Sequence, residues 1–397
     1  MSSPPPMLFS PFKLRELAVK NRLCISPMCT YSAVGGFVSD WHLVHLGQHA
    51  LGGAGIIFVE ATAVEERGRI THSDTGLWDD KFISPLARIA SFLRSQGVAP
   101  AIQLAHAGCK ASAQVPWRGA SYLSEVDAQT RGEQSWATVS STAQPLDSGW
   151  HTPHALTIDE IGDVVSAWRA AAERAKNAGF DIVEIHAAHG YLLHQFLSPL
   201  LNKRADGYGG DREGRMRLTL EVVETVRDVW PKTLPVFVRL SAVDGAASSW
   251  TLEDSVVLAK ELKARGVDVV DCSSGGLVGS GVAREVEPFG SLSRDFGFQV
   301  PYAARIRNEA GVATMAVGLI VDPHHAERIL QEGQADIIAI ARSALFHPYW
   351  MKYAARTLQN ERAFESWPTE YGFWLEKWEP VVERLRGRVP NDVQPSS

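Results

Sequence analysis

Three side chains that can donate hydrogen bonds and exchange protons lie within six positions of each other, at His186, His189 and Tyr191. His186 ends the stretch 181–186, in which apolar and polar residues alternate, and His189 and Tyr191 follow it. Alternation with a period of two predicts a β-strand. Titratable groups at the carboxyl end of a strand are typical of active sites in parallel α/β proteins. Residues 181–191 are therefore the first candidate active site.

The two histidines are compatible with more than one kind of protein. His186 and His189 do not form the HExxH motif of zinc enzymes, and no second ligand pair with matching spacing follows them. The four cysteines include no CxxC pair, and no GxSxG nucleophile motif occurs. A metal-dependent hydrolase that uses both histidines stays open as one alternative. An inactive binding or scaffold protein is another.

The composition excludes several functional classes. The chain has 397 residues, of which 45% are hydrophobic and 21% charged, and its net charge is −6. No block of Lys or Arg indicates nucleic-acid or membrane-surface binding. No apolar run approaches the roughly 18 residues of a transmembrane helix, and the first residues do not resemble a secretory signal. With few cysteines, we expect a cytoplasmic protein.

Eight strand-like stretches alternate with helix-like stretches along the chain. The strands are expected at 21–26, 54–61, 99–105, 181–186, 234–240, 267–272, 312–317 and 335–341. The helices are expected at 41–51, 80–96, 157–178, 209–230, 252–265, 302–310, 323–331 and 349–358. This alternation predicts an α/β protein with a parallel sheet, and eight units predict a (β/α)8 TIM barrel. We expect one barrel domain over 1–397, capped by the long excursion 108–153 after the third strand.

Several polar residues share the parity that points into such a barrel. Glu184 and His186 alternate with apolar residues on the fourth strand, as Gln103 does on the third and Arg239 on the fifth. Burying polar side chains costs several kcal/mol unless each finds a partner. An internal ion pair between Glu184 and Arg239 is one explanation. The position of these residues near the active end of the barrel favours a functional one.

A phosphate site is expected after the last two strands. Gly318 follows the seventh strand and Arg342 the eighth, which is where barrels commonly bind phosphate. Glycine allows close approach of the backbone, and arginine can bind phosphate through two hydrogen bonds. A turn glycine and a surface arginine are the alternative. Together with the inward polar residues, this pattern predicts a phosphorylated cofactor across the barrel mouth.

Five separated motifs occur in order on these units. They are NRLCISPMCTY, DWHLVHLGQHALGGAGIIFVEATAV, QLAHAGCKA, EIHAAHGYLLHQFLSPLLNKRADGYGG, and AVGLI with ARSALF. With these motifs, nearly the whole chain resembles the Old Yellow Enzyme family of FMN-dependent ene-reductases. The sequence PMCTY is similar to that of its thermophilic-like and xenobiotic-reductase branch.

The resemblance implies how FMN is bound. By this resemblance Cys29 lies near the O4 and N5 edge of the flavin and tunes its potential. Arg239 stabilises the negative charge of reduced flavin near N1 and O2. The residues that match FMN-binding positions of the family are Pro27, Met28, Cys29, Ala61, Gln103, Arg239, Gly318, Ala341 and Arg342.

The resemblance also implies the reaction. NADPH or NADH reduces the flavin, and hydride then passes from flavin N5 to the β-carbon of an activated C=C bond. His186 and His189 hydrogen-bond the carbonyl, imide or nitro oxygen of the acceptor, and Tyr191 protonates the α-carbon. Tyr31 and Lys110 line the substrate pocket. A relative acting mainly on nitro compounds, nitrate esters or another xenobiotic is the second possibility.

The chain departs from the family pattern in several places. YGGDREGR at 208–215 replaces YGGSxENR, Ala341 stands where glycine usually precedes the phosphate arginine, and the loop 275–297 is long. In relatives the C-terminal segment reaches a neighbouring active site. We therefore expect a homodimer or a dimer-based tetramer, in which the segment 359–397 brings Trp374 near the partner's pocket. The sequence does not decide the physiological substrate, the stereochemistry or the choice of nicotinamide.

Overall fold

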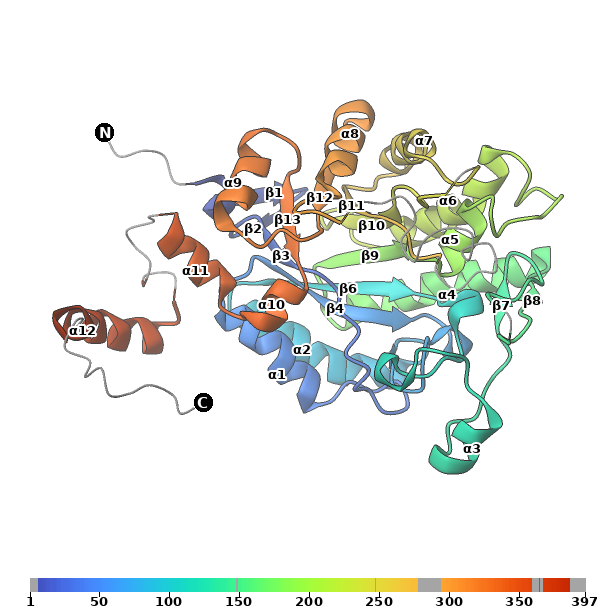
Figure 1. The fold of residues 1–397 in the computed structure, drawn as a ribbon, viewed down its shortest axis with the longest axis horizontal. Helices are drawn as coiled ribbons and strands as arrows, with labels where there is room; N and C mark the ends of the chain where they lie inside the picture. Colours follow the sequence, from blue (N-terminus) through green and yellow to red (C-terminus); the bar gives the residue numbers. More distant parts are fainter. Residues whose placement is uncertain are drawn as a thin grey trace.

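A closed barrel of eight parallel strands forms the centre of the molecule (Figure 1). The computed structural model describes residues 6–358, 364 and 367–385, apart from 148, 247 and 278–293. Each barrel strand pairs in parallel with its neighbours, and pairing of the first strand with both the second and the last closes the ring. The strands are β3 (Leu23–Ile25), β4 (Ile56–Ala63), β6 (Ala99–Ala105), β9 (Ile182–Ala187), β10 (Val236–Ser241), β11 (Val269–Ser273), β12 (Ala313–Ala316) and β13 (Ile337–Ile340).

Eight helices follow the barrel strands in turn, so the predicted (β/α)8 TIM barrel is confirmed. A capping box of Thr157 with Glu160 is present at the start of the longest of these helices. The eight helices are α1 (Asp40–Leu51), α2 (Ile83–Ser95), α4 (Ile158–Asn177), α6 (Arg212–Val229), α7 (Leu252–Ala264), α8 (Val300–Ala310), α9 (Pro323–Gln331) and α11 (Trp350–Thr357).

Short elements decorate this frame. The remaining α-helices are α3 (Glu125–Arg131), α5 (Leu192–Leu197), α10 (Arg342–Phe346) and α12 (Thr369–Leu385). The remaining strands are β1 (Phe12–Leu14), β2 (Leu17–Val19), β5 (Thr75–Gly76), β7 (Val139–Ser140) and β8 (His154–Ala155). The 3-10 helices are η1 (Met7–Phe9), η2 (Glu66–Gly68), η3 (Asp80–Phe82), η4 (Gly108–Lys110) and η5 (Pro116–Arg118).

Strand parity separates two hydrophobic cores. Val183 and Ile185 belong to the large core between the strands and the helices. Ile182, which has the parity of Glu184 and His186, belongs to the smaller core inside the barrel. This confirms the expected facing of the fourth barrel strand. The β1–β2 hairpin contributes Leu14 and Val19 to the hydrophobic core inside the barrel. The polar side chains that point into the barrel lie towards its opposite end.

The segment after β6 is not structureless. Residues 108–153 contain η4, η5, α3 and β7, and Trp136 Nε1 of this segment donates to the Arg67 carbonyl at 3.0 Å. Trp117 meets Tyr31 edge to face, with ring centroids 5.9 Å apart. This contact reaches a residue expected at the substrate pocket, so the capping role of residues 108–153 remains our proposal. No helix in the described part of the chain is both long and apolar enough to span a membrane.

Candidate active site

The turn between β9 and α5 carries the three residues singled out first. His189 and Gly190 both adopt left-handed backbone conformations, with φ of 59° and 72°. Such a φ is uncommon for histidine, and observed strain of this kind is concentrated at functional sites. A Cβ on Gly190 would lie 2.5 Å from the Gly276 carbonyl oxygen, so this position admits only glycine. The turn is therefore tightly specified.

One nitrogen of the His186 ring lies close to one nitrogen of the His189 ring. His186 Nε2 and His189 Nδ1 are 3.4 Å apart, and the rings meet at 84°. The Ala188 N–H donates to His186 Nδ1 at 3.3 Å, so the neutral His186 ring carries its proton on Nε2. Burial, followed by the charge of Arg239, lowers the pKa of both histidines well below the ordinary value. His186 Nε2–H is therefore a neutral donor, and His189 Nδ1 beside it is a second donor when its ring proton lies on that nitrogen.

A serine that sequence reasoning missed contacts the far side of His189. Ser273 Oγ, at the end of β11, lies 2.7 Å from His189 Nε2 and 3.5 Å from Gln299 Oε1. Ser274 Oγ donates to the same Gln299 oxygen at 2.7 Å. A strand-end serine has no distinctive sequence signal, and only the fold brings Ser273 to the histidine. Ser273 can thus influence which nitrogen of His189 is protonated.

Tyr191 and Lys110 lie beside the histidines. The Tyr191 ring is 5.1 Å from the His186 ring, and Lys110 Nζ is 5.1 Å from the Tyr191 ring centroid. Burial raises the pKa of the Tyr191 phenol, which keeps it protonated. Lys110 Nζ donates to the carbonyls of His189 and Gly276 at 2.8 and 2.9 Å. Desolvation lowers the pKa of Lys110 to about 8.

The expectation that Glu184 and Arg239 form an ion pair is wrong, because each of the two residues has another partner. Arg239 Nη1 lies 3.3 Å from Asp271 Oδ2, whereas Glu184 Oε1 accepts from Gln103 Nε2 at 2.8 Å. The cause is register, because Arg239 pairs with Asp271 across β10 and β11, and Gln103 pairs with Glu184 across β6 and β9. Burial, and then the charge of Asp271, raises the pKa of Glu184. These residues form a polar layer below His186.

The segment after β3 supplies the half-buried Pro27, Met28 and Cys29. Burial raises the pKa of the Cys29 thiol, and the nearby Glu60 carboxyl acts in the same direction. Glu60 Oε2 accepts from the Thr30 N–H at 2.6 Å and so fixes this segment, a role the sequence did not suggest. Pairing of β4 with β6 is interrupted between Val59 and Thr62. This irregularity takes Ala61 out of the hydrogen-bond ladder at the place expected to face a cofactor.

The expected phosphate site is formed by the ends of β12 and β13, which are neighbours. Gly318 has a φ of 119°, and its carbonyl accepts from the Gly297 N–H at 3.0 Å. Ala341 precedes α10, and Arg342 begins it and is exposed. Within the described residues, no hydrogen bond or ion pair occupies the Arg342 guanidinium. An arginine without a partner among the described residues, which follows the strand next to that of a left-handed glycine, is suited to an anionic group.

Trp374 is an expected site residue that lies outside the barrel of this chain. It is on α12, which stands apart from the barrel in Figure 1, and its indole is 67% exposed. Its ring contacts within the described residues are with Phe373 and Lys377. Residues 278–293 of the long loop, and residues 386–397 of the C-terminal segment, lie outside the described residues, as do the expectations made for them.

The donor set at the barrel mouth fits a flavin mononucleotide. Arg239 Nε is buried and has no hydrogen-bond partner in the part of the chain that the structure describes, so a cation is available for an electron-rich group. Ala61 and Gln103 lie on the adjacent strands β4 and β6, and Arg342 is free for a phosphate. Among the described residues, no group of three or more His, Cys, Asp or Glu side chains could hold a metal ion.

The buried cation, the hydrogen-bond donors and the arginine unpaired among the described residues, all at the open end of the barrel, are suited to hold an anionic, phosphorylated cofactor. Residues 7–361 match the model of the NADH:flavin oxidoreductase / NADH oxidase family, and the chain belongs to this family. This confirms the resemblance to the Old Yellow Enzyme family. The chain is an oxidoreductase of that type, with FMN and a nicotinamide nucleotide as cofactors.

Close relatives and solved structures agree with this assignment. The chain is 43% identical over 354 residues to an NADPH dehydrogenase of Geobacillus sp. (strain WCH70), which covers 89% of this chain and 94% of that protein. It is 44% identical over 356 residues to an NADPH dehydrogenase of Bacillus licheniformis, with 89% and 95% covered. Morphinone reductase has a similar structure, with a TM-score of 0.71, 26% identity, and 90% and 91% of the two chains covered.

A larger protein shares the fold alone. The structure of 2-naphthoyl-CoA reductase superimposes with a TM-score of 0.77 at 23% identity, over 88% of this chain. The chain spans about half of that protein, since the match covers 52% of it. This likeness supports the barrel architecture and carries no argument about the reaction.

Proposed function

We propose that the protein is an NAD(P)H-dependent ene-reductase. Its substrates would be α,β-unsaturated carbonyl, imide or nitro compounds. The observation that carries the proposal is the approach of His186 Nε2 and His189 Nδ1 to 3.4 Å, beside the Tyr191 ring. Two donors that converge on one point suit a single acceptor oxygen on which negative charge develops.

The electrostatics of the mouth support this role. His186 and His189 are neutral because burial lowers their pKa, so each can donate without the cost of desolvating a charged ring. Arg239 pairs with His186 across β10 and β9, and Lys110 Nζ donates to the His189 carbonyl, so both supply positive charge nearby, which also lowers the pKa of the histidines. A developing enolate or nitronate would be stabilised by this field more strongly than the neutral substrate.

FMN, when bound, supplies the hydride that the protein itself does not hold. Pro27, Met28, Cys29, Ala61, Gln103, Arg239, Gly318, Ala341 and Arg342 are the residues we propose to hold it. Arg239 has the clearest physical reason, because its buried Nε lacks a partner among the described residues. A fixed cation there favours the reduced, anionic form of the cofactor.

Tyr191 is the proposed proton donor to the α-carbon. Its raised pKa keeps the phenol protonated at neutral pH, as a general acid requires. Tyr31 and Lys110 are proposed to line the substrate pocket, and Lys110 also ties the His189 carbonyl to the loop after β11. The names of the relatives favour NADPH as reductant. A cytoplasmic location and a homodimer or dimer-based tetramer are part of the same proposal.

Anaerobic half-reactions test the function directly. The purified yellow protein should be bleached by NADPH or NADH, and its flavin spectrum should return on addition of 2-cyclohexenone, maleimide or a nitroalkene. The double variant His186→Ala/His189→Ala should still bind FMN but lose most of its reoxidation by enones. A colourless protein, or a double variant with wild-type enone kinetics, would overturn the proposal.

A further inference from the structure

We propose that His194 and Asp244 are positioning residues, which hold the turn 188–191 in the conformation that aims His189 and Tyr191 at the acceptor. This inference rests on the proposed ene-reductase function for its catalytic meaning. Both side chains are fully buried and neither would touch the substrate. They act through the backbone of the turn, and Gly190 is the point of contact.

The backbone of the turn is disfavoured on its own and is held from several sides. The left-handed His189 and Gly190 follow each other, which an isolated chain rarely adopts. Four side chains bind their four backbone polar groups. Ser241 Oγ accepts from His189 N, Lys110 Nζ donates to His189 O, His194 Nδ1 accepts from Gly190 N, and Gln195 Nε2 donates to Gly190 O.

His194 can accept from the turn in only one protonation state. The Gly190 N–H donates to His194 Nδ1 at 2.8 Å, so this nitrogen must offer its lone pair. The ring proton must then lie on Nε2, which donates to Asp244 Oδ1 at 2.7 Å. If the tautomer were reversed, two N–H groups would face each other at Gly190. The hydrogen bond from His194 Nε2 to Asp244 therefore fixes the tautomer in which His194 Nδ1 can accept from the Gly190 N–H.

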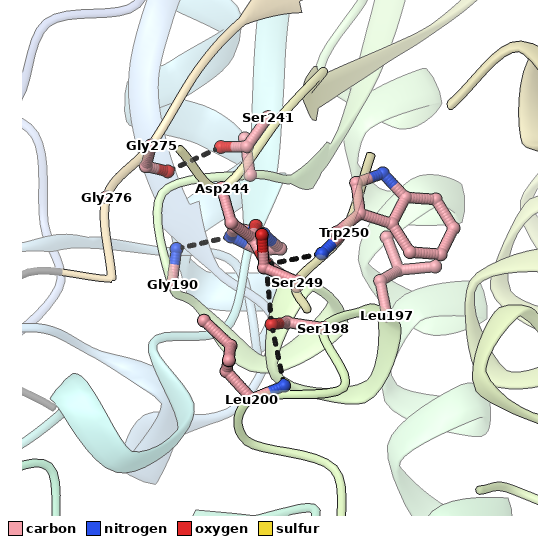
Figure 2. A network of polar contacts seen from close by, with 12 residues as sticks. Gly190, Leu197, Ser198, Leu200, Ser241, Asp244, Ser249, Trp250, Gly275 and Gly276 are labelled. Atoms are coloured by element: carbon pink, nitrogen blue, oxygen red, sulfur yellow. Dashed lines mark hydrogen bonds and ion pairs between the residues drawn. The ribbon is translucent and has the colours of Figure 1, made fainter. Parts of the chain in front are cut away.

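Asp244 is suited to fix this tautomer because all its partners are donors. Besides His194, it accepts from Ser198 Oγ at 2.7 Å and from the Trp250 N–H at 3.0 Å, both through Oδ2. A carboxylate is the only side-chain group of this shape that accepts at both oxygens. Figure 2 shows Asp244 with its contacts to Trp250 and Ser198, and a separate dashed line marks the hydrogen bond that the Gly190 N–H donates.

The network links three segments that are distant in sequence. Asp244 lies in the loop after β10, His194 in α5, and Gly190 in the turn itself. Ser241, at the end of β10, accepts from His189 N and donates to the Gly275 carbonyl at 2.7 Å (Figure 2). The loops after β9, β10 and β11 thus share one set of hydrogen bonds, and a change at Asp244 should appear at His189.

Asp244→Asn is the first test, in the FMN-loaded protein. An amide has a single acceptor oxygen, so one of the three donors must face an N–H group. We expect binding of a para-substituted phenol, whose oxygen stands in for the enolate oxygen, to weaken about tenfold, or ~1.4 kcal/mol. FMN affinity should stay within about twofold. Ser198→Ala is the matched control, because it removes a donor to Asp244 without touching the His194–Gly190 branch.

A double-mutant cycle separates positioning from a general loss of structure. In a His189→Ala background, Asp244→Asn should cost little further phenol affinity, because its effect is transmitted through His189. Strictly additive losses would overturn the proposal. If Asp244→Asn fails to load FMN, His194→Asn and His194→Leu carry the test. Asparagine can present an oxygen where Nδ1 lay, so it should bind phenol more tightly than leucine, and equal affinities would overturn the proposal.

Hydrogen exchange of residues 187–193 gives a readout that needs no ligand. Asp244→Asn should speed exchange in this peptide, whereas Ser198→Ala should not. Unchanged exchange in Asp244→Asn would overturn the positioning role. If the wild-type protein binds no phenol and is not reoxidised by enones, the proposed function fails instead, and the exchange experiment still decides the role of Asp244.

Discussion

At the scale of the residue, the acceptor site depends on the tautomer of His189. With its proton on Nε2, His189 donates to Ser273 Oγ, and its Nδ1 accepts from His186 Nε2. With its proton on Nδ1, His189 joins His186 as a second donor, provided that Ser273 donates to Nε2. The other acceptor within reach of the Ser273 hydroxyl, Gln299 Oε1, is 3.5 Å away and also accepts from Ser274 at 2.7 Å, so His189 Nε2 at 2.7 Å is the nearer partner. Ser273 therefore supports the form that binds an oxyanion.

Ser273→Ala should weaken phenol binding by about fivefold to tenfold, which is the typical worth of one hydrogen bond. Spectroscopic titration of the oxidised protein measures this. Ser274→Ala is the control, because that hydroxyl contacts Gln299 but not His189. Ser273→Thr keeps the hydroxyl and should bind nearly as the wild type. Equal behaviour of the two alanine variants would contradict the tautomer argument.

The acceptor half-reaction should not show a histidine ionisation near neutral pH. Burial and Arg239 lower the pKa of His186 and His189 well below 6.5, so their neutral forms persist. We expect kcat/KM for a non-ionising enone to stay flat from about pH 5.5 to 7.5, where an ordinary histidine titrates. The unfolded chain binds these protons and the folded chain does not, so both histidines reduce stability as pH falls below 6.5. A step in kcat/KM near pH 6.5 would contradict this.

Residue types and spacing were enough to single out His186, His189 and Tyr191, but not their partners. Ser273 and Asp244 lie far from the turn in sequence and have no motif of their own. Parity showed that Arg239 points inward. It could not show that Asp271 on β11 is its ion-pair partner, because that depends on cross-strand register.

At the scale of the element, the inward-pointing residues of one strand contribute to different regions of the barrel interior. On β9, Ile182 belongs to the inner hydrophobic core, Glu184 to the buried polar layer and His186 to the mouth. Burial raises the pKa of Glu184 above its ordinary 4.5, so the folded protein holds a proton that the unfolded chain releases. Stability from this group is therefore present at low pH and is lost as pH rises above 4.5.

Glu184→Gln should flatten this dependence. Each proton held only by the folded state contributes a slope of about 1.4 kcal/mol per pH unit, and glutamine keeps a neutral group next to Gln103 without titrating. Urea unfolding between about pH 5 and 7 measures the slope. Glu332→Gln makes the same exchange of side chains at an exposed position and is the control. A Glu184→Gln protein with the wild-type slope would contradict the assignment of this proton.

The barrel elements were predictable because strand-like and helix-like stretches alternate eight times along the chain, whereas the short additional elements have no place in that repeat. All eight barrel strands and their helices lie within a few residues of the expected ranges. The three-residue strands β1 and β2 and the six-residue helix α5 have no periodic signal of useful length. They form because tertiary contacts stabilise them. Leu14 of β1 and Val19 of β2, for example, pack in the hydrophobic core inside the barrel.

At the scale of the whole molecule, contacts within a single chain do not account for the exposed apolar face of α12. In Figure 1 the helix stands apart from the barrel, and large apolar side chains lie exposed along it. Tyr371, Trp374, Trp378, Val381 and Leu385 are spaced alternately by three and four residues, which places them on one face of the helix. An exposed apolar face of this kind marks an interaction site. We propose that a second copy of the chain covers it.

Trp374→Ala/Trp378→Ala should therefore shift the protein towards monomer in light scattering. It should also raise KM for the acceptor more than it lowers kcat, because Trp374 is proposed to lie near the partner's pocket. Glu376→Ala is the control, since residues two positions apart point to opposite sides of a helix. Truncation after residue 366 should have the same effect as the tryptophan pair. A dimeric double variant with wild-type KM would contradict the role of α12, and would leave the barrel mouth of one chain as the complete site.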